Sequence, residues 1–196
     1  MEIVVATRNR KKLNELNRML GGLGVTLLGL DSFPEFPEVE ETGSTFEENA
    51  KLKAGQAALF TGRYALADDS GLEVDALGGA PGVYSARYAG PDANDRKNLQ
   101  LLLQELAGVS EERRGARFRA VLVLSDASGQ SAAVFDGKVE GRIGFEPRGD
   151  NGFGYDPVFF PEGHDRTFAQ MAALEKDSMS HRGRALEKLK EYLAAK

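Results

Sequence analysis

The chain of 196 residues contains no cysteine and no tryptophan, and its only histidines are His164 and His181. The absence of cysteine excludes disulfides, thiol nucleophiles and thiolate metal sites, and it is compatible with a reducing cytoplasm. A zinc site built from several histidines is also disfavoured. No apolar run approaches the roughly 20 residues of a membrane-spanning helix. The first residues carry an acid where a signal peptide carries basic residues. We therefore expect a cytoplasmic protein without membrane contact.

The sequence also lacks an excess of positive charge. Its formal net charge is −5, whereas broad nucleic-acid binding needs a basic face. Basic residues nevertheless form two compact groups, one within residues 8–12 and one within residues 181–184. Because an acidic protein with two small basic groups suits a small polyanion better than a polymer, we expect no nucleic-acid polymer as partner.

The spacing of apolar residues predicts a single α/β domain over residues 1–196. Strands are expected at 3–6, 25–28, 64–67, 117–124, 131–142 and 158–160. Helices are expected at 10–20, from Thr45 to about 60, at 94–106, and from Ser180 onward. Because residues 117–142 form a hairpin pattern, the sheet is expected to be mixed.

Two adjacent acids form the pattern that is most suggestive of chemistry. Asp68 and Asp69 follow the apolar run 64–67 and precede Ser70-Gly71. This arrangement predicts a strand that ends in a sharp turn and presents both carboxylates at the edge of a sheet. Adjacent carboxylates suit Mg²⁺, which binds protein oxygens together with substrate phosphates. A solvated Asp-Asp-Ser-Gly turn is the alternative.

A basic segment lies where the first strand passes into the first helix. A helix N-terminus supplies N–H groups and a positive dipole, which together suit a triphosphate. The segment lacks the glycines of a P-loop, and a capped helix with solvated basic residues is the alternative. The residues of this candidate phosphate site are Thr7, Arg8, Asn9, Arg10, Lys11 and Lys12.

The helix that begins after Thr45 carries two polar residues on an otherwise small and apolar stripe. They are Asn49 and Lys53, which either border a cleft or let the lysine extend to the rim of the core. Glu40 and Glu41 precede this helix and could join the Asp pair around a metal. Since neighbours in an extended chain point in opposite directions, only one of the two is expected to face the metal.

Two further segments could recognise a base. In residues 152–156, Gly152 and Gly154 flank Phe153, so the backbone can approach a ligand while the ring stacks on it. A glycine-rich loop with a core phenylalanine is the alternative. In residues 176–184, cations in the first turn of a helix oppose the helix dipole. Donors aimed at carbonyl oxygens or at a phosphate would compensate for this misfit.

In this order, the segments resemble the inosine triphosphate pyrophosphatase family, whose members cleave non-standard purine nucleoside triphosphates. The resemblance extends from the first strand to the last helix. Arg8 departs from it, because the family usually has a small residue there, and so do Asn151 and Asp177. The matching runs are residues 6–12, 41–50, 67–72, 78–88, 152–157 and 180–182.

The resemblance implies a long central mixed sheet with flanking helices and two lobes around a nucleotide cleft, usually in a homodimer. It implies Mg²⁺-dependent hydrolysis of ITP, dITP and XTP to the monophosphate and pyrophosphate, which cleanses the nucleotide pool. Asp69 would be the general base and would bind the metal with Glu40 or Glu41. Asp68 would play a supporting part. Lys12 and Lys53 would stabilise the phosphates.

The remaining site residues implied by the resemblance contact the substrate. Residues Thr7 to Lys12 would hold the triphosphate and Phe153 would stack on the base. Ser70 would also contact substrate, and the purine would be read by Gly154, Tyr155, Asp156, Lys176, His181 and Arg182. Cationic donors would accept a 6-oxo purine and mismatch the 6-amino group of adenine, while guanine would be rejected through its 2-amino group.

Two other functions remain open from the sequence. An enzyme acting on pyrimidine or other modified nucleotides would keep the phosphate site and change the base pocket. A nucleotide sensor would bind ITP with Mg²⁺ and release no pyrophosphate.

Overall fold

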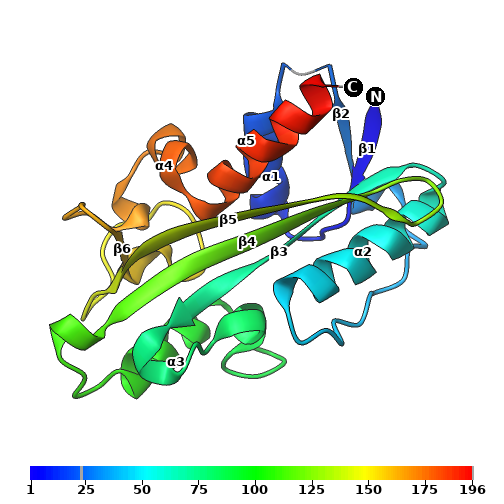
Figure 1. Ribbon diagram of the computed structural model, residues 1–196. Coiled ribbons are helices and arrows are strands. Elements are labelled where there is room, and N and C mark those ends of the chain that lie inside the picture. The colour runs from blue at the N-terminus through cyan, green and yellow to red at the C-terminus, as the bar shows by residue number, and fades with distance from the viewer. Residues whose placement is uncertain (23, 196) are drawn as a thin grey trace. The chain divides into compact units, whose positions relative to one another are not determined.

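The computed structural model describes residues 1–22 and 24–195 (Figure 1). Within them, the strands form one sheet in the order β2-β1-β3-β4-β5-β6. The strands are β1 (Glu2–Val5), β2 (Thr26–Gly29), β3 (Tyr64–Val74), β4 (Gly115–Ser125), β5 (Ser131–Ile143) and β6 (Phe159–Pro161). The α-helices are α1 (Arg10–Leu20), α2 (Phe46–Thr61), α3 (Asp95–Glu105), α4 (Ala173–Met179) and α5 (His181–Ala194).

The sheet is mixed, as the sequence predicts. Strand β1 runs parallel to both of its neighbours, with Ile3 opposite Leu27 of β2 and Tyr64 of β3. Strands β5 and β6 are antiparallel, with Arg142 opposite Phe160. Because strands and helices alternate along much of the chain, the predicted α/β class is confirmed.

Local sequence signals locate several helices well. Helix α1 spans the predicted residues, and Asn9 caps it. Helix α2 begins with the predicted capping box between Thr45 and Glu48, and helix α5 begins directly after Ser180. Helix α4 was not predicted, because seven residues with few apolar members carry no clear helical period.

The predicted turn at residues 68–71 is wrong. Strand β3 continues without a break from Tyr64 to Val74, through both acids. All five residues from Ala65 to Asp69 are buried, so this is an interior strand covered on both faces. The acids are tolerated there because cationic side chains neutralise them, as described below.

The chain divides into two compact units. Unit 1 comprises Met1–Asp69, Ala120–Gly137 and Arg182–Lys196. Within it, helix α2 lies on one face of the strands, and α1 and α5 lie on the other (Figure 1). The apolar cluster of unit 1 contains Ile3, Val5, Leu16, Leu20, Leu66, Leu122, Leu124, Phe135, Ala185, Leu186 and Leu189.

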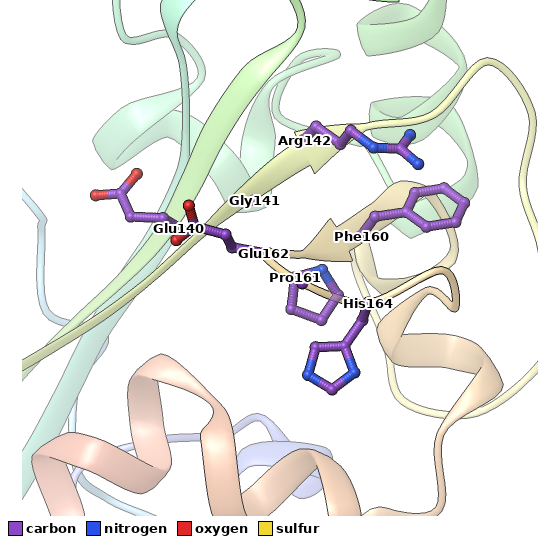
Figure 2. A pocket seen from close by; sticks show the side chains of 8 residues that line it. Glu140, Gly141, Arg142, Phe160, Pro161, Glu162 and His164 are labelled. Atoms are coloured by element: carbon purple, nitrogen blue, oxygen red, sulfur yellow. The ribbon is translucent and has the colours of Figure 1, made fainter.

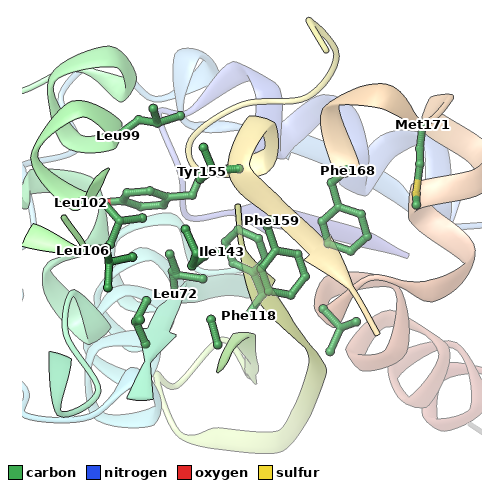
Figure 3. Packing of buried hydrophobic residues seen from close by; sticks show 14 residues of the cluster. Leu72, Leu99, Leu102, Leu106, Phe118, Ile143, Tyr155, Phe159, Phe168 and Met171 are labelled. Atoms are coloured by element: carbon green, nitrogen blue, oxygen red, sulfur yellow. The ribbon is translucent and has the colours of Figure 1, made fainter. Parts of the chain in front are cut away.

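Unit 2 comprises Ser70–Arg119 and Lys138–His181. Its core is rich in aromatic rings (Figure 3). The ring of Phe159 lies 4.6 Å from that of Phe118 and 5.3 Å from that of Phe168, measured between centroids. No helix in the described part of the chain is long and apolar enough to cross a membrane.

Candidate active site

The two adjacent acids of β3 contact side chains from different helices of unit 1. Successive side chains of a strand point to opposite faces. Asp68 accordingly meets Lys12 of α1 and Arg182 of α5, whereas Asp69 meets Lys53 of α2. The side chain of Asp68 is fully buried and that of Asp69 is 10% exposed. One strand therefore places its two carboxylates in two ionic networks, one on each face of the sheet.

Asp69 belongs to the network on the α2 face. The Lys53 Nζ donates to Asp69 Oδ1 at 2.7 Å and to Glu41 Oε1 at 3.0 Å. The second oxygen of Asp69, Oδ2, is buried and has no hydrogen-bond partner among the described residues. A buried carboxylate oxygen without a donor raises the free energy of the folded state. A water or a cation that binds this oxygen would remove that cost.

Burial and charge set the protonation behaviour of this network. Burial raises the pKa of Asp69 above its usual 3.8, against the attraction of Lys53. Burial alone lowers the pKa of Lys53, but the carboxylates of Asp69 and Glu41 outweigh it, so that pKa is raised. Lys53 therefore stays cationic while Asp69 keeps an enhanced affinity for a proton, which suits a general base.

Asp68 belongs to a second network, on the face of α1 and α5. Lys12 Nζ lies 3.3 Å from Asp68 Oδ1. Arg182 donates from Nε to Asp68 Oδ2 and from Nη1 to Glu15 Oε2. Burial lowers the pKa of Lys12, and the attraction of Asp68 only partly opposes this. Burial also lowers the pKa of Arg182, but its two carboxylate partners outweigh it and raise that pKa.

Arg182 lies in the first turn of α5, where a cation opposes the helix dipole. Its guanidinium contacts the carboxylates of Asp68 and Glu15, which compensate for this misfit. Its contact with a purine stays a prediction. Glu15 was missed altogether, because an acid three residues after Lys12 is ordinarily a solvated helix pair. Here it is 7% exposed.

The predicted catalytic trio is brought together. The ammonium groups of Lys12 and Lys53 lie 3.5 Å and 3.4 Å from the backbone carbonyl oxygen of Asp68. Asp69 is the next residue along the strand. Two cations from different helices thus converge beside the candidate base.

The candidate phosphate segment is already tied internally. Asn9 Oδ1 accepts from the backbone N–H of Lys11 and of Lys12, at 3.0 and 3.3 Å, and Thr7 Oγ1 accepts from Asn9 N at 3.1 Å. Three N–H groups expected to face a phosphate therefore have side-chain partners. Arg8 donates to the carbonyl of Phe36 at 2.7 Å, and the exposed Arg10 lies 3.7 Å from Asp31.

The structure distinguishes the two acids before α2. Glu41 is half-buried and contacts Lys53, whereas Glu40 is exposed. Of the two neighbours, Glu41 is therefore the one that contacts the network of Lys53 and Asp69, and its contact with a metal stays a prediction.

The glycine-rich loop of unit 2 is organised by an acid. Asp156 is buried, and its Oδ2 accepts from Phe153 N at 3.0 Å and from Lys176 Nζ at 2.7 Å. The ammonium of Lys176 also lies 5.0 Å from the centre of the Phe153 ring. Gly154 N donates to Asp95 Oδ2 at 2.9 Å. Asp156 therefore holds the predicted stacking residue and the predicted purine-reading lysine together.

Three other predicted substrate residues lie in unit 2. Tyr155 is buried, and its hydroxyl donates to the carbonyl of Ser85 at 2.7 Å, which places it in the core. The ring of His181 stacks on that of Phe118, with centroids 4.8 Å apart. Ser70 is half-buried on β3. Their contacts with a substrate stay predictions.

A substitution at Gly152 tests whether the contacts of Asp156 matter for nucleotide binding. Its φ is +71°, and a Cβ there would lie 2.1 Å from Asp156 Oδ2. Gly152→Ala is expected to displace that carboxylate and raise KM for a nucleotide about 10-fold or more, the cost of one charge-assisted hydrogen bond. Steady-state kinetics would measure the change. Gly163→Ala is the control, since Gly163 has a φ of +78° and open space. Equal effects of the two variants would contradict a role for the Asp156 contacts.

A hollow of about 410 Å³ lies elsewhere in unit 2, beside β5 and β6 (Figure 2). Arg142 covers the ring of Phe160 there, with its guanidinium carbon 4.4 Å from the ring centre. None of the predicted site residues lines this hollow, so volume alone does not locate the candidate site.

The residues around Asp69 fit a magnesium ion. Within residues 1–22 and 24–195, no three Asp, Glu, His or Cys side chains form a ready metal cage. Magnesium does not require one, because it commonly takes one or two protein carboxylates and completes its shell with waters and substrate phosphates. Glu41 and Asp69 both contact Lys53, and Asp69 Oδ2 has no donor in the described chain.

Comparison with known proteins identifies the family of this chain. A family model described as the Ham1 family matches residues 3–192. The chain belongs to the Ham1 family. This confirms the resemblance drawn from the ordered motifs.

Other Ham1-type proteins match over nearly the whole chain. A dITP/XTP pyrophosphatase of Exiguobacterium sibiricum is 53% identical over 193 residues, covering 98% of this chain and 97% of that protein. A dITP/XTP pyrophosphatase of Streptococcus agalactiae is 50% identical over 96% of this chain, which spans 58% of that longer relative. The solved HAM1 protein of Coxiella burnetii is 44% identical, with a TM-score of 0.91 and full coverage of both chains.

Proposed function

We propose that this chain hydrolyses non-standard purine nucleoside triphosphates, namely ITP, dITP and XTP, to the monophosphate and pyrophosphate. The observation that carries the proposal is the convergence of Lys12 and Lys53 beside Asp69, whose Oδ2 is buried without a partner in the described chain. Relatives named dITP/XTP pyrophosphatases at 50–53% identity support the substrate class.

In the proposed mechanism, Asp69 orients a water and accepts its proton as the water oxygen attacks the α-phosphorus. The bond between the α-phosphorus and the oxygen bridging to the β-phosphate breaks, and pyrophosphate leaves with the electron pair. Lys12 and Lys53 stabilise the charge that develops on this leaving group. The raised pKa of Asp69 favours its part as base, since its carboxylate retains affinity for a proton.

We propose that Glu41 and Asp69 hold a Mg²⁺ ion. When bound, it would neutralise charge on the phosphates. The geometry of unit 1 supports this assignment, because Glu41 and Asp69 both contact Lys53 and the Oδ2 of Asp69 is buried without a donor in the described chain.

Selectivity would come from the base pocket of unit 2. The ammonium of Lys176 is held by Asp156 beside the ring of Phe153. As a donor, it suits the 6-oxo group of hypoxanthine or xanthine and mismatches the 6-amino donor of adenine. A buried donor–donor mismatch costs about 1–3 kcal/mol, and sites built on hydrogen bonds can discriminate by about 10⁴-fold.

A pyrophosphate-release assay tests the proposal. The substrates are ITP, dITP, XTP, ATP, GTP and CTP, each with and without Mg²⁺. We expect release from the first three, little release from the others, and loss of activity without the metal. Equal turnover of ITP and ATP would contradict the selectivity, and undiminished turnover in a chelator would contradict the metal. Binding of ITP without pyrophosphate release would instead indicate a sensor.

We further propose a cytoplasmic homodimer without a nucleic-acid partner. The absence of cysteine and the net charge of −5 support the location and the lack of a polymer ligand. Light scattering coupled to size-exclusion chromatography would test the dimer, and a mass of about one chain would contradict it.

A further inference from the structure

The segment that carries Glu41 has no regular structure of its own. Residues 36–43 form neither helix nor strand. The side chain of Glu41 is nevertheless fixed 3.0 Å from Lys53 Nζ. Because irregular backbone is held by whatever its polar groups bind, the contacts of this segment decide where the carboxylate stands.

One side chain of α2 forms hydrogen bonds with the backbone of this segment. Asn49 Oδ1 accepts from Gly43 N at 2.7 Å, and Asn49 Nδ2 lies 3.4 Å from Gly43 O. Asn49 is completely buried. It lies one helical turn before Lys53, on the same stripe of α2. The helix therefore holds Glu41 at its carboxylate through Lys53, and two residues later at the backbone through Asn49.

The contact between Gly43 and α2 is too close for any side chain at Gly43. A Cβ there would lie 2.6 Å from the Cβ of Glu48 and 2.7 Å from Asn49 Oδ1. On the far side, Glu48 Oε2 accepts from Ser44 N at 2.7 Å and from Thr45 N at 3.2 Å. The backbone from Gly43 to Thr45 is thus locked onto the first turns of α2.

We propose that Asn49 is a positioning residue for the reaction, which acts by holding Glu41 where it can share a divalent cation with Asp69. This inference rests on the proposed function, and it names a residue whose side chain contacts neither the phosphates nor the metal in that function. The competing explanation is that Asn49 only stabilises the conformation of the loop and has no effect on cation binding.

The chain contains a matched control for that explanation. Asn98 of α3, in unit 2, is 3% exposed. Its Oδ1 accepts from Ala89 N at 2.8 Å and its Nδ2 donates to Ala86 O at 3.0 Å. Like Asn49, it is four residues past its helix N-cap and fastens the preceding loop. Asn98→Ala therefore removes an equivalent loop contact from a region without Glu41.

The test measures cation binding, without turnover. Electron paramagnetic resonance would follow Mn²⁺ binding to the protein with α,β-imido-ITP, an analogue that cannot be cleaved at the scissile bond. Asn49→Ala is expected to weaken Mn²⁺ binding about 10- to 100-fold, as loss of an outer contact to a metal ligand does. Asn98→Ala is expected to lower Tm by about as much as Asn49→Ala does. It should leave Mn²⁺ binding within about 2-fold of wild type.

A double-mutant cycle with Glu41→Gln makes the test specific. If Asn49 acts through Glu41, Asn49→Ala weakens Mn²⁺ binding by less than about 2-fold in the Glu41→Gln background. Gly43→Ala opens the same contact from the loop side and should weaken binding in the wild-type background. Equal effects of Asn49→Ala and Asn98→Ala, or an undiminished effect of Asn49→Ala beside Glu41→Gln, would overturn the proposal.

The wild-type protein separates this inference from the function on which it rests. If it binds Mn²⁺ with the analogue but releases no pyrophosphate from ITP, the proposed function fails and the cycle still decides the role of Asn49. If it releases pyrophosphate normally and Asn49→Ala binds Mn²⁺ as wild type does, only the positioning role fails.

Discussion

Asp69→Asn is expected to reduce kcat for ITP by about 100- to 10,000-fold, the usual contribution of a positioned general base. The amide keeps the shape of the carboxylate but cannot accept the proton of the attacking water. It also lacks the charge that would bind Mg²⁺. Pyrophosphate release at saturating ITP and Mg²⁺ measures the effect.

The fold should tolerate this change. Burial already disfavours the ionised form of Asp69, as its raised pKa indicates, so a neutral side chain costs no more to bury. Lys53 keeps Glu41 as a partner. We therefore expect Tm to change by only a few degrees. Asp75→Asn is the control, because Asp75 is an exposed acid just past the end of β3. Near-wild-type turnover of Asp69→Asn would exclude Asp69 as the base.

Arg182→Met is expected to lower the free energy of unfolding by about 3–5 kcal/mol, because it removes the buried guanidinium that contacts the carboxylates of both Asp68 and Glu15. For a chain of this length, that corresponds to a fall in Tm of about 6–20 °C. Urea and thermal unfolding would measure it. The loss is large compared with the 5–15 kcal/mol that typically stabilises a domain.

An exposed ion pair on the same helix provides the control. Lys188 of α5 pairs with Asp136 at 2.7 Å, with side chains 51% and 68% exposed. Lys188→Met should cost at most about 1 kcal/mol. Adding Glu15→Gln to Arg182→Met should restore part of the lost stability, because it removes a buried charge that has lost its guanidinium, while Asp68 keeps its contact with Lys12. Equal stability of Arg182→Met and Lys188→Met would show that the buried network contributes little.

The elements that were predicted well depend on local signals. Helix α1 has an N-cap, an apolar period and a glycine stop within a dozen residues. The capping box of α2 lies within four residues, from Thr45 to Glu48. Such signals act through neighbouring backbone groups, so the sequence contains most of the information that decides them.

The course of β3 could not be predicted in the same way. Asp68, Asp69, Ser70 and Gly71 together have the composition of a turn. What keeps them in a strand is neutralisation by Lys12, Lys53 and Arg182, which come from three different helices. Arg182 and Glu15 are 167 residues apart in the chain. Their pairing is decided by tertiary packing, for which a single sequence gives no local sign.

Asp156 shows the same limit within the base loop. The sequence predicts that residues 152–156 contribute to a base pocket, and it suggests Asp156 as a reader of the base. In the structure, this carboxylate is 3% exposed and is occupied by Phe153 N and Lys176 Nζ. A motif indicates which residues gather, whereas burial and partners decide which of them face solvent.

The central claim is that water attacks the α-phosphorus of a non-standard purine triphosphate. Hydrolysis of ITP in ¹⁸O-labelled water, followed by mass spectrometry of both products, tests it most directly. The proposed mechanism predicts one ¹⁸O atom in the inosine monophosphate and none in the pyrophosphate. Label in the pyrophosphate, or in released inorganic phosphate, would contradict it.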